Sequence, residues 1–339
     1  LSQLRELSKM QYSREFKRSA STKAVPFNPA AASSASLFND PGLEYQWHFV
    51  NNGTLEGQTR TDFITGADVN CKAVWDKCTG DPSIIVAVMD EGVMWSHPDL
   101  RQNIWENPEE TYKSGEDNDG NGYVGDKYGF NFVDGTGVIS WSGLDDTGHG
   151  THVAGTIAAV NNNGVGVCGI AGGNNGGGVK IMSLQIFSGQ RGVTMENQVK
   201  AVKYAADNGA VVLQCSWGYM SALANPLDYP SSGFYTDEEY EDYMTLEKES
   251  FDYFIHHAGT ENGVLDGGVI VFAAGNEYAA MASYPGAHKD FICVSSVTAD
   301  YTPSTYTNYG PGVDVAAPGG DVDYHKTIKG GVLSTLPPL

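Results

Sequence analysis

The stretch GHGTHVAGT, residues 148–156, is the most informative part of this sequence. It places His149 in a glycine-rich turn, and small and β-branched residues follow it at helical spacing. Upstream, the apolar run IIVAVM at 84–89 ends on Asp90. A carboxylate that follows a buried strand and a histidine that begins a helix are thus the first two candidates for a functional site.

Apolar runs and helical patterns alternate along the chain. A second strand-like run, VIVFAAG at 269–275, ends on Asn276. We predict strands over 84–89, 179–187, 211–216, 269–274 and 292–297, and helices over 67–78, 150–160, 194–208 and 237–258. Strands that are apolar throughout and alternate with helices indicate an α/β fold, a doubly wound and mostly parallel sheet with helices on both faces. Ligands of such sheets bind beyond the carboxyl ends of the strands, where Asp90, Ser216 and Asn276 fall.

The first 36 residues differ from the rest. Residues 2–18 are compatible with a charged helix, and residues 19–36 are rich in Ser, Ala and Pro. We interpret 1–36 as a tail, a linker or the remnant of a pro-segment, and 37–339 as one domain. The chain opens on Leu1 without a signal-peptide pattern, as a processed or trimmed product would.

Composition excludes several classes of partner. The chain has 41 acidic and 20 basic residues and a formal net charge of −21, which argues against nucleic acid and anionic membranes. No apolar run approaches the roughly 18 residues that a transmembrane segment needs. The five cysteines are odd in number and widely spaced, so a disulfide framework is not expected. Cys71 and Cys78 lie about two helical turns apart and should not bridge.

The chemistry of the three polar residues is complementary. Asp90 can orient a histidine, His149 can transfer protons near neutral pH, and Asn276 can donate to a developing oxyanion. Each also has a structural interpretation, namely a turn-forming Asp, a capping His and a loop Asn. His152 lies inside the predicted helix, where packing is the better interpretation. Zinc binding by the histidine pair is disfavoured because the neighbouring Glu of zinc proteases is missing.

Asp90, His149 and Asn276 follow one another in this order and are flanked by several further motifs. In both respects the chain resembles the subtilisin-like serine proteases, or subtilases. The matching segments cover most of residues 39–336, and the histidine motif is the most specific of them. They are VAVMDEGV at 86–93, HPDL at 97–100, residues 148–156, CSWG at 215–218, AAGNE at 273–277, SYPGA at 283–287, and 304–318.

The resemblance implies a peptide or protein substrate and a role for each matched residue. Asp90 would be the orienting acid, His149 the general base and acid, and Asn276 the oxyanion donor. Residues of two segments would bind the substrate, which would pair with one of them as an added strand. They are Ser216, Trp217, Gly218, Ala274 and Gly275. On this basis residues 37–339 are the N-terminal part of a catalytic domain.

The sequence departs from the family in two ways. Glu91 follows Asp90, where the family usually has Ser or Thr, and a second carboxylate there is expected to affect the pH dependence of activity. No Gly-Thr-Ser-Met-Ala-like motif is present, and Ser334 matches the region before the nucleophile rather than the nucleophile. We therefore expect the nucleophile on a C-terminal fragment of the same precursor, beyond Leu339. The alternative is a non-catalytic, calcium-stabilised peptide-binding pseudoprotease.

The segment DNDGNGYVGD at 117–126 indicates a calcium site. Its first six residues fit the D-x-[DN]-x-[DN]-G loop, with glycine at the sharp turn. Tyr128 stands where a closing Glu is expected, so we predict that Asp126 closes the site. The predicted ligands are Asp117, Asp119, Asn121, the Tyr123 carbonyl and Asp126.

A second calcium site follows only from the resemblance. It would join the N-terminal segment to the loop after the histidine helix through Asp40, Asp99 and Asn162. Calcium and an acidic surface suit a secreted or cell-surface protein. An acidic insert, DEEYED at 237–242, either shapes the cleft, binds a partner or is a solvated helix face.

Overall fold

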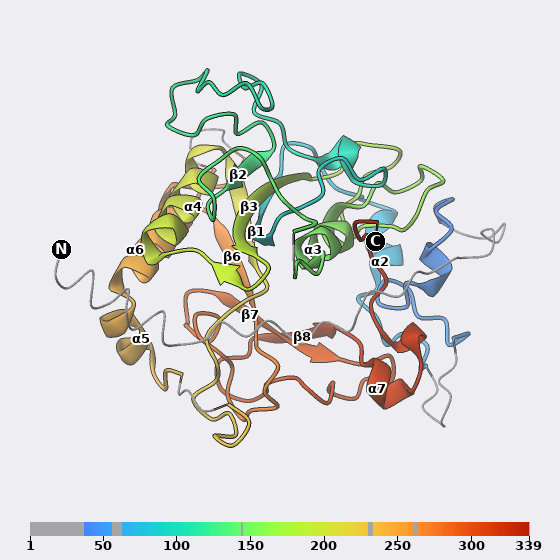
Figure 1. The fold of residues 1–339 in the computed structure, drawn as a ribbon. Coiled ribbons are helices and arrows are strands. Elements are labelled where there is room, and N and C mark those ends of the chain that lie inside the picture. Colours follow the sequence, from blue (N-terminus) through green and yellow to red (C-terminus); the bar gives the residue numbers. More distant parts are fainter. Residues whose placement is uncertain (1–36, 56–62, 144, 230–232, 260–263, 339) are drawn as a thin grey trace.

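The fold is built around one mostly parallel sheet (Figure 1). The structure is a computed structural model that describes residues 37–55, 63–143, 145–229, 233–259 and 264–338. The strands run in the order β2-β3-β1-β5-β6-β7-β8, and β4 pairs with β3. Their bounds are β1 Ile85–Glu91, β2 Gly129–Asn131, β3 Lys180–Ser188, β4 Arg191–Gly192, β5 Ala210–Cys215, β6 Val269–Ala273, β7 Ile292–Val297 and β8 Val315–Pro318. Only the β3–β4 pair is antiparallel among these.

Helices cover both faces of the sheet, as the doubly wound prediction requires. α3 (His149–Ala158) contacts β1 and β3 on one face. α4 (Met195–Asp207) and α6 (Thr245–His257) pack against each other and against strands on the other face. The shorter elements are α2 Cys71–Trp75, α5 Asp237–Tyr243, α7 Val322–His325 and the 3-10 turns Leu43–Tyr45, Arg101–Asn103 and Ile328–Gly330. The main core lies between the sheet and α4 and α6, and a smaller one lies under α3.

The sheet is unevenly covered on the α3 face. Successive side chains of a strand point to opposite faces of the sheet. The register between neighbouring strands then shows which positions of β5, β6, β7 and β8 lie on the α3 face. Several are apolar yet accessible, with Val269 37%, Ile292 41% and Val315 51% exposed. On the opposite face the alternate residues Ile270, Phe272 and Cys293 are buried. An apolar stripe next to α3 is therefore partly open.

The last described residues run along α3. The Ser334 hydroxyl donates to the His152 carbonyl at 2.7 Å, and the Thr335 hydroxyl donates to the Thr151 carbonyl at 2.8 Å. A β-carbon on Gly155 would lie 2.1 Å from the Thr335 hydroxyl and 2.8 Å from its main-chain nitrogen, so only glycine allows this crossing. Pro337 lies against Gly148, directly before His149.

The structure corrects some predicted elements. The helix predicted over 237–258 is two helices, because Met244 leaves helical geometry at φ −117° and ψ 34°. The helix predicted over 67–78 is only α2, which begins after Asn70 in the left-handed conformation. The short strands β2, β4 and β8 carry too few residues for a periodicity signal. The predicted tail at 1–36 lies outside the described residues.

All five cysteines are free. The single helix predicted to contain Cys71 and Cys78 is instead the short helix α2 followed by a turn. Among the described helices, none has the length and apolar composition to cross a bilayer.

Candidate active site

Asp90 and His149 form a hydrogen-bonded pair at the edge of the sheet. Asp90 is a buried residue at the end of β1, and His149 is the first residue of α3. The imidazole Nδ1 lies 2.8 and 2.9 Å from the two carboxylate oxygens. Because a carboxylate only accepts, Nδ1 carries the proton and Nε2 is the basic nitrogen of the neutral ring. This is the tautomer that a general base needs.

Glu91 holds the main chain of the same histidine. Its carboxylate accepts from the backbone N–H of His149 at 2.9 Å and of Thr147 at 3.1 Å, and from the Thr147 hydroxyl at 3.2 Å. The register of β1 against β3 shifts between Asp90 and Glu91, and such a bulge re-aims side chains. Gly148 offers α3 no side-chain cap, so the Glu91 carboxylate serves the helix N-terminus.

Asn276 lies on the loop that follows β6, at the same edge of the sheet as Asp90. Asn308, which the sequence interpretation missed, organises this loop. It is fully buried, its Oδ1 accepts from the backbone N–H of Glu277 and Ala279, and its amide donates to the Ala274 carbonyl at 2.9 Å. Gly275 has φ +104°, and a β-carbon there would meet the Asn308 amide at 2.4 Å. The Asn276 amide is thus carried on a tightly held turn.

The predicted substrate-binding segment follows β5. The Ser216 hydroxyl accepts from the Gln214 amide at 3.1 Å. The Trp217 ring is mostly buried and packs edge-on against Phe272 at 5.4 Å. Gly218 passes close to Tyr284, whose carbonyl lies 2.9 Å from the site of a β-carbon. The segments around Gly218 and Tyr284 therefore lie side by side.

His152 has a structural place. Its Nε2–H donates to the Val332 carbonyl at 3.1 Å, and burial lowers the pKa of the ring to about 4. The predicted packing role agrees with this contact.

Three carboxylates converge beside the glycine-rich acidic loop. Ligand oxygens of Glu110, Asp119 and Asp126 lie within 4.8 Å of one another. One oxygen of Glu110 is buried and has no hydrogen-bond partner in the part of the chain that the structure describes, which fits a site that a cation completes. Burial raises the pKa of Asp126. Glu110 precedes the loop and was not foreseen from its pattern.

The other predicted calcium ligands differ in their environment. Asp117 accepts from the backbone N–H groups of Gly120, Asn121 and Gly122, so it shapes the loop. The Asn121 amide donates to Asp119 and Asp126, and the Tyr123 backbone N–H donates to the Asn121 side chain.

The second predicted set is brought together across the chain. Asp40 accepts from the backbone N–H of Asn162 at 2.6 Å, and Asp99 accepts from that of Val167 at 2.8 Å. Burial raises the pKa of Asp99 to about 7. Main-chain donors therefore satisfy these carboxylates, and the calcium site there stays a prediction.

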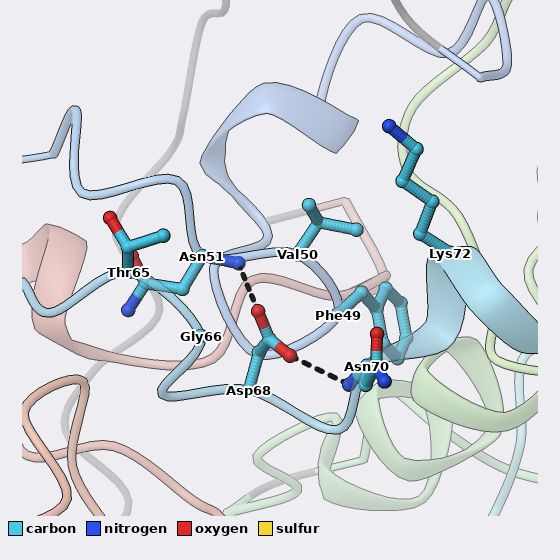
Figure 2. Close-up of a pocket in the computed structure, with 8 residues that line it drawn as sticks. All are labelled: Phe49, Val50, Asn51, Thr65, Gly66, Asp68, Asn70 and Lys72. Carbon is cyan, nitrogen blue, oxygen red and sulfur yellow. Dashed lines mark hydrogen bonds between the residues drawn. The ribbon is translucent and has the colours of Figure 1, made fainter.

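A separate open cavity of about 390 Å³ is lined by residues that lie between 49 and 72 in the sequence (Figure 2). Asp68 accepts from the backbone N–H of Asn51 and Asn70 at its wall. None of the sequence-predicted site residues lines this cavity.

Comparison with known proteins places the chain in a family. The sequence matches the subtilase family over residues 81–337. It is 31% identical over 291 residues to an extracellular protease of Xanthomonas campestris, with 84% of this chain and 43% of that protein covered. It is 28% identical over 285 residues to the halolysin-like extracellular serine protease Nep of Natrialba magadii, with 84% and 42% covered.

Solved structures agree on the fold. A protease of Pseudoalteromonas arctica matches with a TM-score of 0.58 at 25% identity, covering 89% of this chain and 80% of that one. The serine protease of Aeromonas sobria matches with a TM-score of 0.59 at 19% identity, covering 90% and 47%. The chain spans about two fifths of the length of the curated relatives it matches. From the extent of the family match and the doubly wound sheet, the chain belongs to the subtilase family.

Proposed function

We propose that this chain is the larger part of a serine endopeptidase that hydrolyses peptide bonds with an Asp-His-Ser triad. The observation that carries the proposal is the Asp90–His149 pair, in which the ring is fixed with Nε2 as its basic nitrogen. Asn276 follows β6, two strands from β1 along the same sheet edge, and would donate to the oxyanion. A pure peptide binder has no use for an oriented imidazole, which favours the enzyme over the binding module.

The mechanism follows from these groups. His149 Nε2 takes the proton of the serine hydroxyl as its oxygen attacks the scissile carbonyl, and Asp90 stabilises the imidazolium that forms. The ring then returns the proton to the leaving amine, which leaves an acyl-serine, and the same imidazole activates the water that hydrolyses this ester and frees the serine. The peptide would pair with the main chain of residues 216–218, facing the wall of Ala274 and Gly275.

We propose that the serine lies on a segment of the same precursor beyond Leu339. Residues 334–335 run along α3 and Pro337 lies against Gly148, so a following residue would enter the region beside His149. The half-open apolar stripe that includes Ile292 and Val315 offers such a segment a surface to bury. Three of the relatives are also about twice as long as this chain.

Calcium is proposed as a structural ion. Glu110, Asp119 and Asp126 would hold it at the acidic loop, with Asn121 and the Tyr123 carbonyl as further predicted ligands and Asp117 shaping the turn. The ion would balance converging negative charge and tie residue 110 to the loop. Two relatives are named extracellular proteases, which supports a secreted or cell-surface location.

The test is a search for the companion segment together with an activity assay. Intact mass and N-terminal sequencing of everything that copurifies with the chain should reveal a polypeptide with a Gly-Thr-Ser sequence. A fluorophosphonate probe should label that serine, and Asp90→Asn and His149→Ala should abolish labelling. A precursor with no such serine, or labelling unchanged by both substitutions, would reject the endopeptidase in favour of the peptide-binding module.

A further inference from the structure

Glu247 is a buried carboxylate outside the Asp90–His149 pair. It lies on α6, in the stretch that the sequence predicted as one continuous helix, and its side chain is fully inaccessible. Its Oε1 accepts from the Tyr240 hydroxyl at 2.8 Å, and its Oε2 accepts from the Tyr219 hydroxyl at 2.9 Å and from the Gln198 amide. One carboxylate thus joins α4, α5, α6 and the segment after β5.

Tyr219 connects this carboxylate to the predicted substrate-binding segment. It directly follows Gly218, and its backbone N–H donates to the Tyr284 carbonyl at 2.7 Å. Its ring packs edge-on against Phe234 at 5.4 Å. The hydrogen bond to Glu247 therefore fixes the side chain of Tyr219. The main chain of the same residue aligns the 216–219 segment with Tyr284.

The same cluster also holds Tyr284 itself. The Tyr240 ring stacks on the Tyr284 ring at 5.2 Å, and the Tyr284 hydroxyl donates to Asp237 at the start of α5 at 2.8 Å. At the other end of α5, Glu241 accepts from the buried His288 at 2.9 Å. The acidic insert is thus anchored to the 284–288 segment and is more than a solvated helix face.

We propose that Glu247 is a positioning residue for substrate binding, which acts through Tyr219 to hold residues 216–219 against Tyr284. The proposal rests on the proposed function, because it takes 216–218 as the strand that pairs with the peptide. It predicts a larger effect on KM than on kcat, since Asp90 and His149 are held by other contacts.

The ionisation of Glu247 gives the proposal a distinctive signature. Burial raises the pKa of this carboxyl to about 7, although the three hydrogen bonds oppose the shift. The other titratable groups that face it are the Tyr219 and Tyr240 phenols and the Cys215 thiol on β5. Burial raises the pKa of Tyr240 and Cys215, so both stay neutral near pH 7. The ionised carboxylate accepts three bonds, whereas protonation turns one oxygen into a donor and weakens the hold on Tyr219.

The experiment compares Glu247→Gln with Glu249→Gln, an exposed glutamate on the same helix. KM and kcat are measured between pH 5.5 and 8.5 in the complete protease, on a fluorogenic tetrapeptide taken from a positional library. In the parent protein KM should rise as the pH falls through neutrality. Glu247→Gln should raise KM at pH 8 roughly fivefold to tenfold, the effect of weakening one hydrogen bond to a charged group, and flatten its pH dependence. Glu249→Gln should match the parent.

Tyr219→Phe supplies a second route to the same answer. This substitution removes the hydroxyl group and keeps the aromatic ring, so folding should be preserved even if Glu247→Gln is unstable. The double variant should have the KM of Tyr219→Phe alone, because both substitutions remove the same interaction between Glu247 and Tyr219. Additive effects, or a KM profile of Glu247→Gln that keeps the parental pH dependence, would overturn the proposal.

Failure of the proposed function would look different. If the complete protease hydrolyses nothing, binding of the tetrapeptide to the chain is followed by calorimetry across the same pH range. Binding that weakens at low pH in the parent and is pH-independent in Glu247→Gln would support the positioning role without hydrolysis. Binding unaffected by the substitution would reject it.

Discussion

The backbone N–H of His149 donates to the Glu91 carboxylate at 2.9 Å, while the ring of His149 donates to the carboxylate of Asp90, the residue before Glu91. Two consecutive acidic residues of β1 thus hold one histidine by its main chain and by its side chain. The contact from Glu91 was not expected from the family pattern, in which a short hydroxyl residue usually follows the aspartate.

Replacing Glu91 by Ala should impair both stability and turnover. The N–H groups of Thr147 and His149 would lose a buried acceptor, which costs about 1–3 kcal/mol for each unsatisfied group. We expect a lower midpoint of urea unfolding and a lower kcat. Glu91→Ser, the family-like variant, should recover part of the kcat, because a hydroxyl can still accept one N–H. If Glu91→Ala had the parental kcat and stability, the main-chain hold would be irrelevant.

Replacing Asn276 by Leu should lower turnover with little change in KM, because an oxyanion donor acts mainly in the transition state. The expected loss is roughly 10²–10³-fold in kcat, a magnitude known from another subtilase. Steady-state kinetics on the same peptide checks it. Asn225→Leu, at an exposed loop position, is the control and should leave kcat unchanged.

Calcium removal should destabilise the protein through the Glu110 group. We expect chelation to lower the thermal unfolding midpoint, and added calcium to restore it. Glu110→Gln should weaken calcium binding at least tenfold by calorimetry, since it removes one charged ligand. Its neighbour Glu109 is exposed, and Glu109→Gln should bind calcium like the parent. Equal affinities of the two variants would remove Glu110 from the site.

His48 should make the fold sensitive to acid. Burial lowers the pKa of its ring to about 3, with a smaller contribution from His152, and neither ring nitrogen has a hydrogen-bond partner among the described residues. An unfolded chain binds this proton near pH 6.5, so the contribution is complete above that pH and is lost as the pH falls towards 3. His48→Phe should flatten the dependence of the unfolding free energy on pH in this window by up to about 1.4 kcal/mol per pH unit. Denaturant titrations at several pH values measure it, and the exposed His256→Phe should keep the parental slope.

Local signals were enough to predict much of the architecture. The apolar run that becomes β1 and the glycine turn before α3 each reveal their structure within about ten residues. Residues 237–258 were predicted as one helix because charged and aromatic residues continue the helical pattern through Met244, whose backbone leaves helical geometry. Glu110 and Asn308 could not be predicted from a pattern, because each contacts residues that lie beyond the local motif. Their roles depend on how loops fold back, which spacing alone does not encode.

The strand order has a consequence for the life of the newly made chain. Asp90 and His149 are 59 positions apart, and β1 lies between β3 and β5, both of which are synthesised later. Parallel pairings of this kind form only after long loops have closed, so they come late in folding. A nascent chain that has not yet reached β3 and β5 therefore lacks both neighbours of β1, and we expect the Asp90–His149 pair to become ordered only after residue 215 has been made.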